Sequence, residues 1–174
     1  MIYELNQNHS SSSVAIDKIS AHFSAAHFLI SDHYEEGLHG HNYLVGIEVK
    51  GSMDIFDMII DFVFLENLLS EVLLDWDHFV LIPSKNKHMK IHENKDNLEI
   101  NYGKRFYSIP KEEVKILDCT NVTTETLARL LGEKLQTRLK KENFWERIQA
   151  ITATIWEKSY YRANYTIKTN SLEN

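Results

Sequence analysis

Cysteine is scarce in this chain, and segments that could span a membrane or direct secretion are missing. Cys119 is the single cysteine among 174 residues, so the chain can form no internal disulfide and no cysteine-based structural zinc site. No apolar run approaches the roughly 18 to 20 residues that span a bilayer. The polar segment 1–13 lacks the basic start and apolar block of a secretion signal. We therefore expect a cytoplasmic protein with no membrane partner.

Positive charge is also in deficit. The 19 Lys and Arg residues are outnumbered by 25 Asp and Glu residues, and the net charge of -6 argues against a general nucleic-acid surface. With 43% hydrophobic residues, the chain can bury one substantial core. No internal repeat or linker divides it. We expect a single domain over residues 1–174, with flexible polar ends at 1–14 and 168–174.

The pattern of apolar residues predicts a hairpin followed by helices and further strands. Ile16–Phe28 and Tyr43–Gly51 are predicted to be two strands joined by the polar loop Ser31–Leu38. Helical periodicity follows Asp61 as far as Leu74, and again follows the capping candidates Asn121, Thr123 and Thr124. The other expected elements are a turn and short strand over Ser52–Ile60, a solvated loop over Ser84–Asp96, a hairpin of Leu98–Tyr102 and Arg105–Ile109, and a last strand over Gln149–Glu157. This order predicts an α+β fold with helices on one face of an antiparallel sheet.

Three histidines can meet on the predicted hairpin. His39 and His41 are two residues apart in an extended segment, so their side chains point to the same side. His27, on the preceding strand, can supply a third nitrogen, whereas His22 is out of phase with it. Three neutral imidazoles with an open fourth position are typical of catalytic zinc, while structural zinc is usually closed by four protein ligands. The sequence therefore predicts a Zn²⁺ site at His27, His39 and His41.

Five short motifs together resemble one enzyme family. Phe23–His27 and His39–Tyr43 resemble the zinc-binding motifs of the 6-pyruvoyltetrahydropterin synthase family, which includes the 6-carboxytetrahydropterin synthases. The further matches, in the family's order, are Ile60-Asp61-Phe62, Asp77-His78, Asn121–Glu125 with Val122 where proline is usual, and Ile155–Glu157 followed by Ala163–Tyr165. The resemblance covers nearly the whole chain, from about residue 20 to residue 165.

The resemblance implies an architecture and a set of site residues. The architecture is the tunnelling fold (T-fold), in which an antiparallel sheet with two helices on one face joins those of neighbouring subunits into a β-barrel. Family members are usually homo-oligomers, commonly hexamers made of two trimers, with active sites between neighbours. The resemblance further implies zinc at the three histidines, a catalytic Asp77–His78 pair, Glu157 as the pterin anchor, and pterin contacts from Thr123, Thr124 and Glu125.

The loop before His39 departs from the type members of the family, which carry a catalytic cysteine there. This loop has Glu35 and Glu36 and no cysteine. Counting back from His39 puts Glu35 at the cysteine position, whereas Glu36-Gly37-Leu38-His39 resembles the Glu-x-x-His pattern of a subgroup that uses glutamate. We favour Glu36 as the base. The alternative is that both are solvated loop acids with no role.

The resemblance implies a zinc-dependent carbon–oxygen or carbon–carbon lyase acting on 7,8-dihydroneopterin triphosphate. The product would be 6-hydroxymethyl-7,8-dihydropterin with a glutamate base, or 6-pyruvoyltetrahydropterin as in the cysteine members. One alternative is a 6-carboxy-5,6,7,8-tetrahydropterin synthase of deazapurine (queuosine or archaeosine) biosynthesis. Another is a non-catalytic zinc- or pterin-binding oligomer. The sequence leaves open whether iron or nickel replaces zinc, and which basic residues hold the triphosphate among Lys87, Lys90, Lys104 and Arg105.

Overall fold

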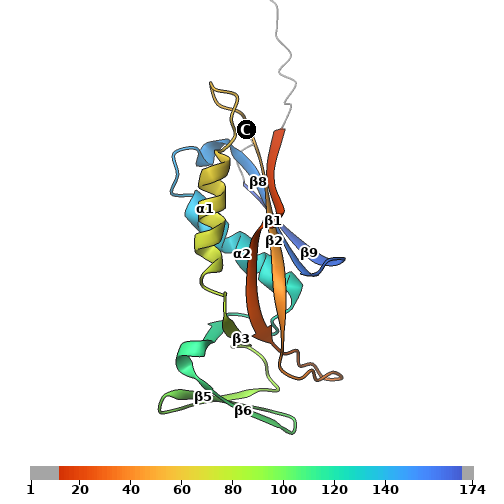
Figure 1. The fold of residues 1–174 in the computed structure, drawn as a ribbon. Helices are drawn as coiled ribbons and strands as arrows, with labels where there is room; N and C mark the ends of the chain where they lie inside the picture. The colour runs from red at the N-terminus through yellow and green to blue at the C-terminus, as the bar shows by residue number, and fades with distance from the viewer. Residues whose placement is uncertain (1–11, 170–174) are drawn as a thin grey trace, which may run out of the picture.

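In the described part of the chain, two β-sheets and two α-helices make up the fold (Figure 1). The computed structural model describes residues 12–169, without the side chains of residues 18–20. The larger sheet has the strand order β7-β3-β1-β2-β8-β9, and the smaller one has the order β4-β5-β6. The larger sheet consists of β1 (Ser12–His27), β2 (His39–Gly51), β3 (Phe79–Pro83), β7 (Val114–Leu117), β8 (Ile148–Lys158) and β9 (Tyr161–Lys168). The remaining elements are β4 (Lys90–Asn94), β5 (Asn97–Tyr102), β6 (Arg105–Pro110), α1 (Phe62–Leu73), α2 (Thr124–Leu139) and two short 3₁₀ helices at Lys111–Glu113 and Trp145–Arg147.

Side-chain caps start both α-helices, and apolar faces hold them on the larger sheet. The Asp61 carboxylate accepts a hydrogen bond from the Phe64 amide at 2.8 Å, and the Thr123 hydroxyl accepts one from the Thr126 amide at 3.2 Å. Both helices share one hydrophobic core with the inward-facing residues of β1, β2 and β8. The fully buried leucines of this core include Leu65, Leu69, Leu127 and Leu131. Each contributes about 1.5–3 kcal/mol through burial of its side chain.

The smaller sheet covers a second hydrophobic cluster. Its buried members are Phe28, Ile30, Ile82, Leu98, Ile100 and Tyr102. Phe28 and Ile30 directly follow β1, so the chain passes from the first core into the second as it enters the loop between β1 and β2. In Figure 1 this loop lies at the same end of the larger sheet as the β5–β6 hairpin.

Most of the predicted elements are confirmed. The β1–β2 hairpin, both helices, β8 and the β5–β6 hairpin lie where the sequence patterns place them, and Gly103 in the β5–β6 turn has a φ of 53°. The larger sheet is mostly antiparallel, as expected, and β3 adds parallel pairings with both β1 and β7. Neither helix of the described residues has the length and apolar character needed to cross a membrane.

Two expectations about irregular segments are wrong. Ser52–Ile60 contains turns and no strand, because the Asp54 carboxylate accepts hydrogen bonds from the Phe56 and Met58 amides and closes the segment on itself. The loop expected over Ser84–Asp96 contains β4, which pairs with β5. Strands β3, β7 and β9 were not expected. Most of the predicted flexible ends, residues 1–11 and 170–174, lie outside the described residues, and the described Ser12, Val14 and Lys168 belong to strands.

Candidate active site

The three predicted ligand histidines converge at one end of the β1–β2 hairpin. Antiparallel pairing places His27 opposite His39 and Ala25 opposite His41, so all three imidazoles project from the helix-covered face. One ring nitrogen from each residue lies within 4.8 Å of those of the other two. The ring centroids are 4.6, 4.8 and 5.3 Å apart. The hairpin register therefore assembles a three-nitrogen cluster, as the sequence predicts.

Hydrogen bonds to backbone carbonyls orient two of these rings. His27 Nδ1 donates to the Val122 carbonyl at 2.7 Å, and His39 Nδ1 donates to the Gly37 carbonyl at 2.9 Å. Because a carbonyl oxygen only accepts, each neutral ring carries its proton on Nδ1 and keeps a lone pair on Nε2. Carbonyl partners of this kind fix the tautomer of metal-binding histidines.

Two of the remaining ring nitrogens, His27 Nε2 and His41 Nε2, are buried and have no hydrogen-bond partner within the part of the chain that the structure describes. Burial lowers the pKa of both imidazoles, and the neighbouring histidines lower it further. Neutral rings with inward-facing lone pairs are the form that binds a metal ion. The donor set thus fits zinc held by three histidines with one position left for another ligand.

The structure distinguishes the two glutamates of the loop. Glu36 Oε1 lies 3.8 Å from His39 Nε2 and accepts a hydrogen bond from the Tyr34 hydroxyl at 3.1 Å. The Glu35 carboxylate instead lies against Gly103 in the β5–β6 turn. The Tyr102 hydroxyl donates to the Glu36 carbonyl at 2.9 Å, which ties the loop to the smaller sheet. Of the two acids, Glu36 is the one beside the histidine cluster.

Glu157 reaches the cluster from β8. Its Oε1 lies 3.6 Å from His41 Nε2, and its Oε2 accepts a hydrogen bond from the Thr124 hydroxyl at 2.8 Å. A register shift between Trp156 and Lys158 interrupts the β8–β9 pairing around Glu157. Thr123 caps α2 and Glu125 is exposed in its first turn; no hydrogen bond or ion pair joins either one to the histidines among the described residues.

Asp77 and His78 form a pair that lies apart from the histidine cluster of the same subunit. His78 Nδ1 is 2.9 Å from Asp77 Oδ2, while Asp77 Oδ1 accepts a hydrogen bond from the Ser24 amide at 2.8 Å. This amide bond is the main reason that the pKa of Asp77 is lowered. His78 has a φ of 65°, and its side chain is 81% exposed. It lines a hollow with Ser24 and Asn42, whose side chains belong to the face of the hairpin opposite His27.

Tyr43 supports the site, although no role was assigned to it from the sequence. It stacks on Phe23 and lies edge-on to His27 and His41, and its buried hydroxyl has no hydrogen-bond partner among residues 12–169. Burial raises its pKa. The available signal was that Tyr43 follows His39 and His41 at the same two-residue spacing.

Among the four basic triphosphate candidates, Lys87 pairs with Asp32 at 2.9 Å and the Arg105 guanidinium lies beside Gly37.

Comparisons with known proteins identify the family and agree with the fold. The family model described as 6-pyruvoyl tetrahydropterin synthase matches residues 16–168. A protein from Pyrococcus horikoshii that bears the name 6-carboxy-5,6,7,8-tetrahydropterin synthase is 31% identical over 150 residues, covering 84% of this chain and 87% of its own. The 6-pyruvoyl tetrahydropterin synthase of Plasmodium falciparum superposes with a TM-score of 0.84 at 26% identity, and that of Plasmodium vivax with 0.87 at 23%. Each of these alignments covers 92% of this chain and 99% of the solved one.

The fold and the site define a pterin-acting synthase of the T-fold type. The chain belongs to the 6-pyruvoyl tetrahydropterin synthase family.

Proposed function

We propose that this protein is a zinc-dependent lyase acting on 7,8-dihydroneopterin triphosphate, with Glu36 as the base. The products are 6-hydroxymethyl-7,8-dihydropterin or 6-pyruvoyltetrahydropterin. The observation that carries the proposal is the position of the Glu36 carboxylate, 3.8 Å from His39 Nε2 at the edge of the three-histidine cluster. A carboxylate beside a metal site can remove a proton from a hydroxylated substrate side chain.

His27, His39 and His41 would hold the metal ion. When bound, zinc supplies Lewis-acid polarisation of the hydroxyl groups on the substrate side chain. The carbonyls of Val122 and Gly37 keep two of the three rings in the tautomer that leaves Nε2 free.

Glu36 performs the proton transfer that starts carbon–carbon cleavage. The carboxylate takes the proton of the second side-chain hydroxyl, whose oxygen electrons then form an aldehyde carbonyl. The bond between the first and second side-chain carbons breaks, and its electron pair passes to the first carbon and the pterin ring. A proton returned to the first carbon completes the hydroxymethyl product. The Tyr34 hydroxyl and the backbone bond from Tyr102 hold Glu36 at the place where this transfer occurs.

Glu157 anchors the pterin ring in this proposal. Its Oε2 accepts from Thr124 and keeps a second lone pair, and Oε1 is beyond hydrogen-bond distance of His41 Nε2, so among the described residues both oxygens can still accept from a ligand. The 2-amino and N3–H groups of a pterin are two adjacent donors that match a carboxylate. Thr123 and Glu125, at the start of α2, complete the expected pterin contacts.

The Asp77–His78 pair acts on the site of a neighbouring subunit. Asp77 orients the imidazole through Nδ1, and the exposed His78 ring keeps Nε2 available for proton transfer. Because the pair faces away from the cluster of its own subunit, the expected hexamer of two trimers is needed to bring it to a pterin.

A second candidate is 6-carboxy-5,6,7,8-tetrahydropterin synthase activity, which the name of the Pyrococcus horikoshii relative favours. The type members of the family use a cysteine base, and Cys119 does not replace it. Cys119 is 5% exposed within the main core, and burial raises the pKa of its thiol to about 11. A thiol of this kind is protonated at neutral pH.

The test is to load the purified protein with zinc, add 7,8-dihydroneopterin triphosphate and identify the product by mass and absorbance. 6-Hydroxymethyl-7,8-dihydropterin or 6-pyruvoyltetrahydropterin would support the leading proposal. The carboxylated product would instead support the second candidate. Retention of zinc and substrate without any product would indicate a non-catalytic pterin-binding oligomer.

A further inference from the structure

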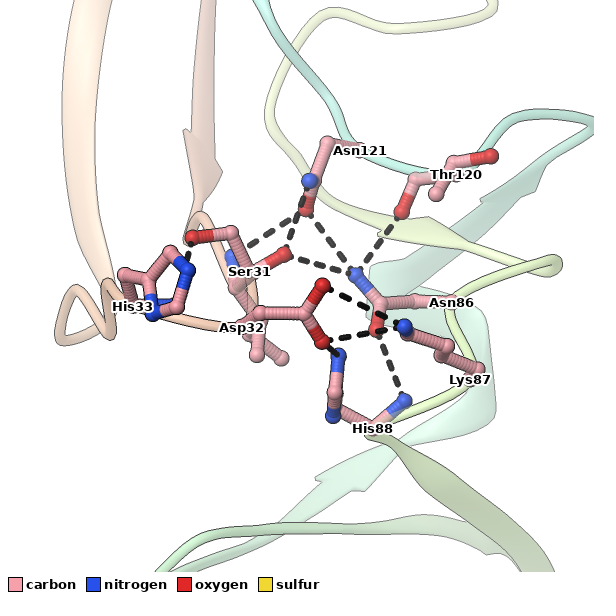
Figure 2. Close-up of polar contacts among 9 residues, drawn as sticks. Ser31, Asp32, His33, Asn86, Lys87, His88, Thr120 and Asn121 are labelled. Atoms are coloured by element: carbon pink, nitrogen blue, oxygen red, sulfur yellow. Dashed lines mark hydrogen bonds and ion pairs between the residues drawn. The ribbon is translucent and has the colours of Figure 1, made fainter.

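Two side-chain amides, those of the buried Asn86 and the half-buried Asn121, hold the backbone of Ile30 in the loop that carries Glu36. Asn121 Nδ2 donates to the Ile30 carbonyl at 2.8 Å, and Asn121 Oδ1 accepts from the Ile30 amide at 3.1 Å. Asn86 Nδ2 donates to the same Ile30 carbonyl at 3.1 Å and to Asn121 Oδ1 at 3.1 Å. Figure 2 shows the two asparagines facing each other where three separate segments of the chain meet.

The Asn86 amide is fully used in this arrangement, because its two N–H groups are shared among three acceptor oxygens, while Asn121 uses its oxygen and one N–H group in the hydrogen bonds given above. Asn86 Nδ2 also lies 2.9 Å from the Thr120 carbonyl, and Asn86 Oδ1 accepts from the His88 amide at 3.0 Å. Asn86 is only 6% exposed. A buried amide is costly unless its donors and acceptor are all satisfied, and a satisfied buried network specifies one geometry. This network therefore fixes the position of the Ile30 backbone.

The position of Glu36 follows directly from that of Ile30. Ile30 and Glu35 form an antiparallel bridge, and the Glu36 amide donates to the Leu29 carbonyl at 2.9 Å. The Ser31 amide donates to the Tyr34 carbonyl at 2.8 Å, so residues 31–34 form a closed turn above the bridge. A displacement of the Ile30 backbone would carry the Glu36 backbone with it.

Asn121 also precedes the residue that orients a metal ligand. The next carbonyl, that of Val122, accepts the hydrogen bond from His27 Nδ1 at 2.7 Å. Asn121 thus connects the loop carrying Glu36 to the orientation of His27, while Asn86 hydrogen-bonds to Ile30 and Asn121 but, among the described residues, to none of the histidines of the cluster.

We propose that Asn86 and Asn121 are positioning residues that set the place of the Glu36 carboxylate relative to the histidine cluster. This inference rests on the proposed function, because it assigns the two amides to the same site. Misplacing a catalytic group by about 1 Å lowers the rate of the catalysed reaction around 100-fold. The two asparagines therefore act on turnover through Glu36 rather than through substrate binding.

Asn86→Asp is the most informative variant, because it keeps the size of the side chain but replaces the donating amide with an acceptor. The new oxygen would face the carbonyls of Ile30 and Thr120. We expect kcat to fall about 10- to 100-fold, with KM within about threefold and zinc content unchanged. Asn86→Ala, which leaves the bonds between Asn121 and Ile30 in place, is the second variant should the aspartate variant fail to fold.

Asp32→Asn provides the matched control on the same loop. Asp32 pairs with Lys87 and His88 at 2.9 Å each, but it is exposed, and exposed ion pairs contribute little. We expect this variant to keep the wild-type kcat. An equal loss in Asp32→Asn and Asn86→Asp would overturn the proposal.

A double variant separates positioning of Glu36 from general stabilisation. In a Glu36→Gln background, Asn86→Asp should cause no further loss of kcat, since the group it positions is already absent. A merely structural role would lower kcat by the same factor in both backgrounds, and that result would refute the inference.

Hydrogen exchange measured by mass spectrometry tests the inference even if the wild-type protein turns over no pterin. Asn86→Asp should accelerate exchange in peptides covering residues 29–38 and leave those of α1 and β8 at the wild-type rate. Unchanged exchange in residues 29–38 would refute the role of the two amides. Absence of wild-type turnover would count against the proposed function alone.

Discussion

Replacing Glu36 with glutamine tests the assignment of the base while leaving the shape of the site unchanged. Glutamine keeps an oxygen that can accept from the Tyr34 hydroxyl, now at 3.1 Å from Glu36 Oε1, but it cannot take a proton. A positioned general base contributes roughly 10²- to 10⁴-fold, which corresponds to about 2.7–5.5 kcal/mol of barrier. We therefore expect kcat of Glu36→Gln to fall by about 10²- to 10⁴-fold.

Glu35→Gln is the matched comparison one residue away. The Glu35 carboxylate lies on Gly103, away from the histidine cluster, so this variant should keep kcat within about threefold of wild type. Both variants are assayed with 7,8-dihydroneopterin triphosphate at saturation, and zinc content is measured in parallel. The reasoning is refuted if Glu36→Gln retains wild-type turnover, or if Glu35→Gln loses as much.

Three further predictions concern stability and substrate binding. Burial lowers the pKa of His27 and His41 below the ordinary 6.5, so the unfolded chain binds more protons and the metal-free protein should lose stability as pH falls below about 6.5. The free energy of unfolding should fall by at most about 1.4 kcal/mol per pH unit for each histidine. Urea unfolding of chelator-treated protein between pH 7.5 and pH 5 measures this change. Unchanged stability over that range would contradict the prediction. Gly103→Ala forces a methyl-bearing residue to a φ of 53° and against a carboxylate, which should cost about 1–2 kcal/mol and lower Tm by roughly 2–8 °C in calorimetry. Glu157→Gln should keep the contact with Thr124 but remove a charge-assisted hydrogen bond to the pterin worth about 1.5–3 kcal/mol. Its KM should therefore rise about 10- to 150-fold. An unchanged KM would exclude Glu157 as the pterin anchor.

The histidine cluster was predictable because it depends on a short-range rule. His39 and His41 share a face through strand alternation alone, and a hairpin brings His27 opposite His39 for the same reason. The helices were equally accessible, since Asp61 and Thr123 are good caps in front of clear apolar periodicity. Local patterns of this kind need no knowledge of the rest of the chain.

The parts that escaped prediction depend on contacts between distant segments. Strands β3 and β7 are short and pair in parallel, so no turn signal marks them. Asn86 lies in a polar, lysine-rich stretch and is buried only because residues 30 and 121 fold over it. Glu36 was favoured over Glu35 from a short motif alone, whereas the contact of the Glu35 carboxylate with Gly103, more than sixty residues away in sequence, could not be foreseen.

The two hydrophobic clusters have a consequence for how the site can change shape. The three imidazoles extend from strands that pack in the main core. Glu36 instead belongs to a loop that packs in the cluster under the smaller sheet. A shift of one cluster against the other would change the gap between acid and imidazoles while leaving the imidazoles in place relative to one another. Substitutions at the boundary between the two clusters could therefore change the reactivity of the site during evolution without altering any of its chemical groups.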